Sequence, residues 1–283
     1  SYLICLFLRY NFLFKIKKIF IKKKKKIMKI AVLIKQVPGT ESSLSLRDDN
    51  LWIEESAATY VMNPPDNFAL EEALLMKEKK GEGEVVVVSM GPARTQKVIR
   101  EALAKGADRG IHIEENGEIE KDPLSVSKAF STVLKEENFD LILTGLQSDD
   151  TGMGQTGVLI GEILEMSTST LVIETDLKDS SVRVKRELES GWFQWVELPL
   201  PASISIQSGL NTPRYPSLKG IMGAKKKEIK VFLNSDINSG SKSQIIEKIS
   251  LPETTKKTEF IEGDSGEVVK RIVNILKNEI KVV

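Results

Sequence analysis

Residues 29–35 read KIAVLIK, a short apolar run closed by a lysine at each end. Runs of the same kind recur at residues 84–90, EVVVVSM, and 139–145, FDLILTG. Uninterrupted apolar runs of this length are typical of strands that are buried on both faces of a parallel sheet. We therefore expect these three segments to be strands of such a sheet.

Helical patterns separate the three runs. Apolar residues recur with helical spacing in residues 66–80 and again in residues 93–106, where the pattern stops at a glycine. A weak strand, GIHIEE, and a helix from about Pro123 to Glu137 follow. This alternation predicts an α/β fold with a mostly parallel, Rossmann-like sheet and helices on both faces.

The second half of the chain changes character. The stretches STLVIETDLKD, SVRVKRELES, WFQWVELPL and ASISIQSG read as consecutive strands joined by turns, which predicts a β-rich antiparallel addition to the sheet. Residues 234–283 begin as a polar Gly/Ser-rich linker and end in an apolar helical stripe. We expect an extended C-terminal arm whose helix docks on its own domain or on another chain.

Residues 1–27 differ from the rest of the sequence. They contain nine of the 41 Lys/Arg residues and none of the 40 Asp/Glu, and their apolar runs are too short to span a bilayer. We expect them to be a non-native upstream extension before a start at Met28, with a membrane-surface anchor as the alternative. Without them the formal charge is −8, which argues against nucleic acid as a partner.

The composition also limits the chemistry. The one cysteine, Cys5, lies in the extension, and the one histidine, His112, lies in an expected strand, where a structural role is more common than catalysis. This leaves no Cys/His set for a metal site and no nucleophile motif, so no catalytic residues are expected. Trp192 and Trp195 are expected to pack within a strand.

Ligands of open α/β sheets bind beyond the carboxyl ends of the strands. The first loop there is KQVPGT (35–40). The second, in VMNPPDNFAL (61–70), places Asn63 at a helix N-cap, Pro64 at the first helical position, and Asp66 where it completes a capping-box-like start. An ordinary helix start explains that loop equally well.

The third loop, GLQSDDTGMGQTG (145–157), contains the pattern G-x-G-x-x-G. A dinucleotide fingerprint turns directly from strand to helix, whereas six residues, including two aspartates, separate the end of this strand from Gly152, the first glycine of the pattern. A single phosphate bound at the following helix N-terminus remains compatible with the loop. The chain contains no phosphate-binding P-loop.

Five stretches together resemble the beta subunits of electron-transfer flavoproteins: KQVPGT, NPPDNFALEEAL, SMGPARTQKVIREALAKGADRGIHI, the third loop, and LPLPASISIQSGLNTPRYPSLKGIMGAKKKEI. The resemblance runs from about Met28 to Phe232. Family members pair with an alpha subunit that holds most of a redox-active FAD, and beta binds a structural AMP in most of them. The resemblance therefore implies a nucleotide-binding domain at residues 28–233 and an arm at 234–283 that docks on alpha.

By resemblance the AMP-binding residues are Leu33, Asn63, Pro64, Pro65, Asp66, Met90, Gly145, Leu146, Gln147, Ser148, Asp149, Asp150, Thr151, Gly152, Met153, Gly154, Gln155 and Thr156. The family's partner-recognition loop corresponds to Leu218, Ile221, Met222, Lys225, Lys226 and Lys227. Its leucine enters a pocket on a dehydrogenase, and its basic residues face acidic groups. A buried leucine followed by a solvated lysine run is the structural alternative.

The implied protein is a cytoplasmic electron carrier of fatty acid oxidation. It takes electrons from flavin-dependent dehydrogenases, such as acyl-CoA dehydrogenases, and passes them to electron-transfer flavoprotein-ubiquinone oxidoreductase. One alternative is an electron-bifurcating member with a second FAD in beta. Another is a hydrolase of the adenine-nucleotide type, but KQVPGT lacks the S-G-G-x-D-S-like loop that such an enzyme requires.

Overall fold

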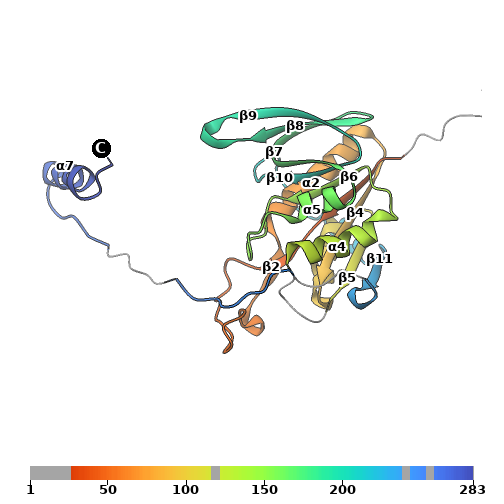
Figure 1. Cartoon of the computed structure of the whole chain (residues 1–283), viewed down its shortest axis with the longest axis horizontal. Helices are drawn as coiled ribbons and strands as arrows, with labels where there is room; N and C mark the ends of the chain where they lie inside the picture. The colour runs from red at the N-terminus through yellow and green to blue at the C-terminus, as the bar shows by residue number, and fades with distance from the viewer. Residues whose placement is uncertain (1–26, 116–121, 238–242, 253–257, 283) are drawn as a thin grey trace, which may run out of the picture. The chain divides into compact units, whose positions relative to one another are not determined.

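The computed structural model describes residues 27–115, 122–237, 243–252 and 258–282. Most of the expected upstream extension, residues 1–26, lies outside the described residues. The chain divides into two compact units, Ser1–Glu247 and Lys248–Val283. The first contains the sheet and helices α2 to α6, and the second contains α7 (Figure 1). None of the helices in the described part of the chain has the length and apolar composition that a membrane crossing requires.

A nine-stranded sheet forms the centre of the first unit, with the strand order β11-β5-β4-β1-β6-β10-β7-β8-β9. Its strands are β1 (Lys29–Leu33), β4 (Glu84–Gly91), β5 (Arg109–Glu114), β6 (Leu141–Gly145), β7 (Ser167–Leu177), β8 (Ser181–Glu187), β9 (Phe193–Pro199), β10 (Ala202–Ile206) and β11 (Ile229–Leu233). From β11 to β7 all neighbours are parallel, whereas β8 is antiparallel to both β7 and β9. The short strands β2 (Gln36–Pro38) and β3 (Tyr60–Met62) pair separately. The predicted α/β class and antiparallel addition are confirmed.

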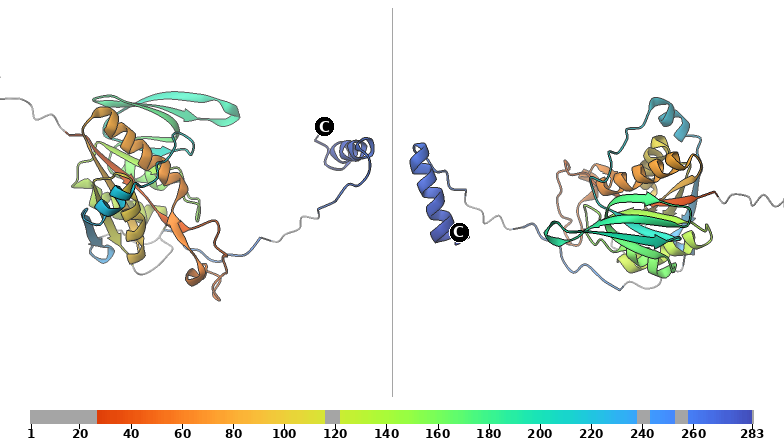
Figure 2. Two further views of the ribbon diagram at one scale, coloured as in Figure 1. Left: turned by 180° about the vertical axis from the view of Figure 1, so that it is seen from behind. Right: turned by 90° about the horizontal axis from the view of Figure 1, so that it is seen from above.

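The place of β10 differs from the prediction of four consecutive strands. Only β7, β8 and β9 form the antiparallel addition, which Figures 1 and 2 show as a long ribbon at one end of the sheet. Strand β10 instead enters between β6 and β7, parallel to both, and all five of its residues are buried. Its serines face a helix that approaches closely, because Ser203 donates to the Gly157 carbonyl oxygen at 2.8 Å. The Ser-Ile alternation that indicates a half-solvated strand therefore belongs to a fully covered one.

Helices cover both faces of the sheet. They are α2 (Pro64–Lys80), α3 (Gln96–Lys105), α4 (Pro123–Lys135), α5 (Thr156–Ile163) and α6 (Leu218–Ala224). Successive side chains of β1 alternate between two cores: Ile30 and Val32 pack in the core that contains residues of α2 and α3, whereas Ala31 and Leu33 pack in the core that contains residues of α4 and α5. This period-two alternation shows that β1 is buried between two helical layers.

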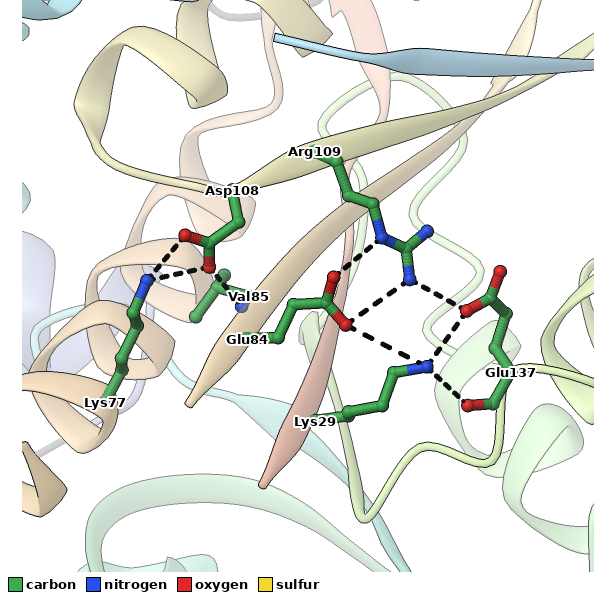
Figure 3. Close-up of polar contacts among 7 residues, drawn as sticks. All are labelled: Lys29, Lys77, Glu84, Val85, Asp108, Arg109 and Glu137. Atoms are coloured by element: carbon green, nitrogen blue, oxygen red, sulfur yellow. Dashed lines mark hydrogen bonds and ion pairs between the residues drawn. The ribbon is translucent and has the colours of Figure 1, made fainter. Parts of the chain in front are cut away.

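Ion pairs hold the amino ends of the strands together (Figure 3). Arg109 Nε lies 2.8 Å from Glu84 Oε1, and Arg109 Nη2 lies 2.8 Å from Glu137 Oε2. Lys29 Nζ shares that Glu137 oxygen at 3.0 Å. Burial opposes ionisation of Glu137, but hydrogen bonds from Lys29 and Arg109 hold its pKa below the ordinary value. The network joins β1, β4, β5 and the end of α4 at the edge of the sheet opposite the ligand-facing loops.

The second unit contains the expected C-terminal helix, α7 (Ser265–Asn274), which continues as a π-helical turn over Ile275–Glu279. Asp264 caps its first turn by accepting from the N–H groups of Gly266 and Glu267. None of the helix residues is buried, and Val269 and Ile272 are 58% and 43% exposed. The predicted apolar stripe thus exists, and the described residues of its own unit leave it exposed.

Candidate functional site

A cavity of about 460 Å³ lies at the carboxyl ends of β1, β4 and β6. From β1 the chain adds β4 and then β5 on one side and later places β6 on the other side, so the direction of winding reverses at β1. Such a reversal separates the loops on its two sides and opens a crevice between them. The predicted location of the ligand site is therefore a real cavity in the structure.

Most of the residues predicted for the nucleotide lie around this cavity. Those in its lining are Leu33, Asn63, Asp66, Met90, Gly145, Leu146, Gln147, Ser148, Asp150, Thr151, Met153, Gly154, Gln155 and Thr156. Pro64, Pro65, Asp149 and Gly152 are not part of the lining. The two prolines start α2, and the Asp149 side chain is exposed outside the cavity.

The second loop works differently from the capping box that its sequence indicates. Asn63 occupies the N-cap position of α2, but its side chain makes no cap hydrogen bond. Its Nδ2 donates to the Gln147 carbonyl oxygen at 3.0 Å, and its Oδ1 accepts from the Asp149 N–H at 3.0 Å. Asp66 accepts from the N–H groups of Lys35 at 2.7 Å and Gly145 at 3.1 Å. These two side chains therefore hold the first and third loops in place.

Asp66 is almost completely buried at the base of the cavity, with 5% of its surface exposed. Burial raises its pKa to about 7, although the N–H groups of Lys35 and Gly145 and the side chain of Asn63 act in the opposite direction. Gly145 packs so closely that an added Cβ would lie 2.4 Å from an Asp66 carboxylate oxygen. A large fraction of Asp66 is thus neutral at neutral pH, which reduces its repulsion of an anionic ligand.

Another acidic side chain in the lining, Asp150, is paired. Lys35 Nζ lies 2.7 Å from Asp150 Oδ1 and 3.4 Å from the Ser148 hydroxyl. Burial opposes ionisation of Asp150, yet the ammonium of Lys35 and the surrounding hydrogen bonds lower its pKa. The aspartates of the third loop therefore do not exclude a phosphate, since one faces away and the other is neutralised.

The glycines of the third loop have separate structural roles. Gly152 and Gly154 adopt left-handed backbone angles, with φ of 62° and 63°. Gly157 lies where an added Cβ would be 2.7 Å from the Thr144 hydroxyl oxygen and 2.9 Å from that of Ser205. The pattern G-x-G-x-x-G here arises from two turns and one close helix–sheet contact, and it is not a dinucleotide fingerprint.

The start of α5 faces the cavity through Gln155, Thr156 and Gly157. The first N–H groups of a helix have no acceptor within the helix, and its dipole places partial positive charge there. Leu33, Met90 and Phe130 provide apolar wall elsewhere in the lining. The cavity can therefore receive a ligand that has a flat apolar part and an anionic group.

Part of the cavity wall comes from residues that the sequence did not indicate. Tyr60 and Arg94 line the cavity, and the Arg94 guanidinium lies 4.0 Å from the centre of the Tyr60 ring. Arg94 also pairs with Glu55 at 3.1 Å, and Trp52 lies in the same lining. Trp52 and Tyr60 come from a stretch without periodicity, which gave no signal. Lys35 belongs to the first loop. The sequence indicated that loop, but it did not identify Lys35 as a residue of the site.

Two further expectations have different outcomes. His112 is fully buried and its Nε2 lies 2.9 Å from the Gly91 carbonyl oxygen, so the expected structural role is confirmed. Trp192, by contrast, lies outside the strand and is 73% exposed, and Trp195 in β9 is 41% exposed. The expectation that both tryptophans pack is wrong, because β9 is the edge of the sheet.

A second candidate surface surrounds α6. Leu218, Ile221 and Met222 are 76%, 45% and 64% exposed, and Lys225 and Lys226 are exposed beside them. The alternative that Leu218 is a core residue is therefore excluded. Lys227 differs from its neighbours, because its Nζ donates to the carbonyl oxygens of Leu103 at 3.0 Å and Ala107 at 2.5 Å. Apolar side chains and two exposed lysines thus share one surface.

These features define a doubly wound α/β protein with a cavity at its topological switch point. The described residues contain no group of three or more His, Cys, Asp or Glu that could hold a metal ion. The electron transfer flavoprotein domain model matches residues 50–237. The electron transfer flavoprotein subunit beta of Methylophilus methylotrophus is 34% identical over 264 residues, which cover 90% of this chain and 99% of that protein.

Two other electron transfer flavoprotein beta subunits are similarly related to this chain. The Dictyostelium discoideum subunit beta is 37% identical over 88% of this chain and 97% of its own length. The Homo sapiens subunit beta is 34% identical over 85% of this chain and 94% of its own length. The chain belongs to the family of electron transfer flavoprotein beta subunits. Membership implies an alpha-subunit partner and a role in electron transfer.

Proposed function

We propose that this chain is the beta subunit of a heterodimeric carrier that accepts electrons from flavin-dependent dehydrogenases, such as acyl-CoA dehydrogenases, and delivers them to a respiratory-chain oxidoreductase. In this proposal the alpha subunit holds most of the FAD, which supplies the redox chemistry. The chain described here contributes a nucleotide site and a docking surface. The observation that carries the proposal is the cavity that joins the three loops to the N-terminus of α5.

AMP is the nucleotide that we propose for the cavity. The N-terminus of α5 and the Thr156 side chain are suited to its phosphate, and Leu33 and Met90 are suited to the apolar faces of its base. The partial protonation of Asp66 and the Lys35–Asp150 pair reduce the electrostatic repulsion that these two aspartates would exert on a phosphate. Asn63 and Asp66 act by positioning the loops, so we assign them a supporting role and not direct contact with the nucleotide.

The docking surface supports the carrier role. An exposed leucine gives a contact one small anchor, whereas adjacent lysines mainly raise the rate of encounter with an acidic partner. A carrier requires both properties, because it must bind quickly, exchange electrons and dissociate. We assign the anchor to Leu218 and the steering charge to Lys225 and Lys226.

A second FAD in the same cavity, as in an electron-bifurcating member, is the alternative. Purification of the co-expressed heterodimer, followed by extraction and chromatography of its nucleotides, distinguishes the two. One AMP and one FAD per heterodimer are expected. Two FAD and no AMP would establish the alternative, and a preparation with no adenine nucleotide beyond the alpha subunit's FAD would refute the proposed site.

A further inference from the structure

The docking helix α6 is fastened to α3 by hydrogen bonds that run in both directions. From α3, Arg100 Nη1 donates to the carbonyl oxygens of Ala224 and Lys227, both at 2.6 Å. In return, Lys227 Nζ donates to the carbonyl oxygens of Leu103 and Ala107. Each cation therefore binds carbonyl groups at the carboxyl end of the opposite helical segment, where unpaired carbonyls and the helix dipole favour a positive charge.

The backbone of α6 also touches α3 directly. An added Cβ on Gly220 would lie 2.2 Å from the Ala104 carbonyl oxygen, so only glycine permits this approach. Ala224 is 3% exposed and belongs to the core, whereas Leu218 and Met222 point outward. Ser217 caps the helix by accepting from the Gly220 N–H at 3.0 Å. One face of a two-turn helix is thus fixed and the other is presented to solvent.

Lys227 is chemically distinct from Lys225 and Lys226, although the three are consecutive. Burial lowers the pKa of Lys227, with a smaller contribution from Lys77, while Asp108 acts in the opposite direction. Its ammonium donates two of its three N–H groups to carbonyl oxygens of α3 and the following residues, which directs it toward α3, whereas Lys225 and Lys226 are exposed. A helix as short as α6 has little stability of its own, so its orientation depends on these contacts.

We propose that Arg100 and Lys227 are positioning residues that hold α6 in its docking orientation, so that the lysine run divides into two steering lysines and one structural lysine. This inference rests on the proposed docking role of Leu218. Lys227 then affects the affinity for the dehydrogenase through the orientation of α6 and not through its charge at the interface.

The test uses the intact heterodimer and a flavin-dependent dehydrogenase that reduces the wild-type protein. Lys227→Met keeps the aliphatic stem and removes the two donated bonds. We expect the heterodimer concentration at half-maximal rate to rise about tenfold at every salt concentration, with the maximal rate and melting temperature little changed. Lys225→Met is the matched control, and we expect it to lose part of its salt dependence and to approach wild type at high salt.

Two additional variants separate geometry from charge. Gly220→Ala alters no charge but must displace α6 from Ala104, so it should reproduce the Lys227→Met phenotype. Lys227→Arg keeps a cationic donor at this position and should therefore show the wild-type concentration dependence. A Lys227→Met variant that behaves like Lys225→Met would overturn the inference. So would a variant that melts earlier but shows the normal concentration dependence.

Hydrogen exchange of residues 218–224 tests the positioning independently of any dehydrogenase. In the Lys227→Met heterodimer these amides should exchange about tenfold faster, while those of α4 are unchanged. Unaltered exchange would refute the positioning role. If exchange rises but neither Leu218→Ala nor Lys227→Met alters dehydrogenase kinetics, the positioning stands and the proposed docking function fails.

Discussion

Replacement of Leu218 by alanine tests whether this residue contributes to docking or to folding. Leu218 is 76% exposed, so about a quarter of its side chain is buried in the chain. Complete burial of a leucine contributes about 1.5–3 kcal/mol, and the truncation should therefore cost less than about 0.7 kcal/mol of folding free energy. For a domain of this size that corresponds to a fall in melting temperature of at most about 2 °C.

The effect on the complex with the dehydrogenase should be much larger. Truncation of an interface anchor typically costs about 2 kcal/mol, or about thirtyfold in affinity. Both quantities can be measured on one preparation of the heterodimer, by thermal unfolding and by dehydrogenase-coupled reduction of its flavin. Leu44→Ala, at a position 46% exposed and distant from α6 in sequence, is the control: on the same scale it should cost up to about 1.6 kcal/mol of folding free energy and leave the reduction kinetics unchanged. A destabilised Leu218→Ala variant with normal reduction kinetics would refute the docking role.

Three more predictions concern the buried charges and the C-terminal helix. Asp66 has a folded-state pKa of about 7 and an unfolded value near 3.8, so the native state holds the extra proton between these values and its stability falls as pH rises from about 4 to 7. Asp66→Asn should remove this slope of about 1.4 kcal/mol per pH unit, and a pH-independent difference in melting temperature from wild type would contradict it. Glu137 has a lowered pKa, so its contribution is present above the unfolded value and is lost as pH falls through the folded one. Glu137→Gln should cost about 1–3 kcal/mol at pH 7 in denaturant unfolding, and this loss should shrink as the pH falls through the folded-state pKa, which lies below 4.5, whereas a loss independent of pH would exclude the ionic mechanism. Deletion of residues 265–283 should weaken assembly with the alpha subunit at least about tenfold, because α7 presents an apolar face that the described part of its unit leaves exposed; an unchanged yield of heterodimer would count against this.

The parallel core could be predicted because its signals are local. The apolar runs that contain Ile30, Val86 and Ile142 are buried on both faces, as their composition indicates. The loops of the cavity could be located for the same reason, since topology alone places them at one edge of the sheet. Resemblance supplied the individual residues within those loops.

The parts that could not be predicted depend on contacts between distant segments. Asn63 looks like a helix cap, but its side chain forms hydrogen bonds with Gln147 and Asp149, which lie 84 and 86 positions further along the chain. Lys227 looks like one of three solvated lysines until the carboxyl end of α3 is placed beside it. Strand β10 has the alternation of a half-exposed strand, and only its position between β6 and β7 shows why serine suits it. Local patterns carry no information about such partners.

The insertion of β10 between β6 and β7 has a consequence for the order in which the protein can be completed during synthesis. Until residues 202–206 leave the ribosome, β6 and β7 cannot be bridged, and each presents an unpaired edge of backbone donors and acceptors. The antiparallel ribbon β7–β8–β9 can form earlier, because its contacts are close in sequence. A nascent chain arrested before Ala202 therefore consists of two sheet fragments with open edges, and this is the stage of its life at which we expect the chain to depend most on chaperones.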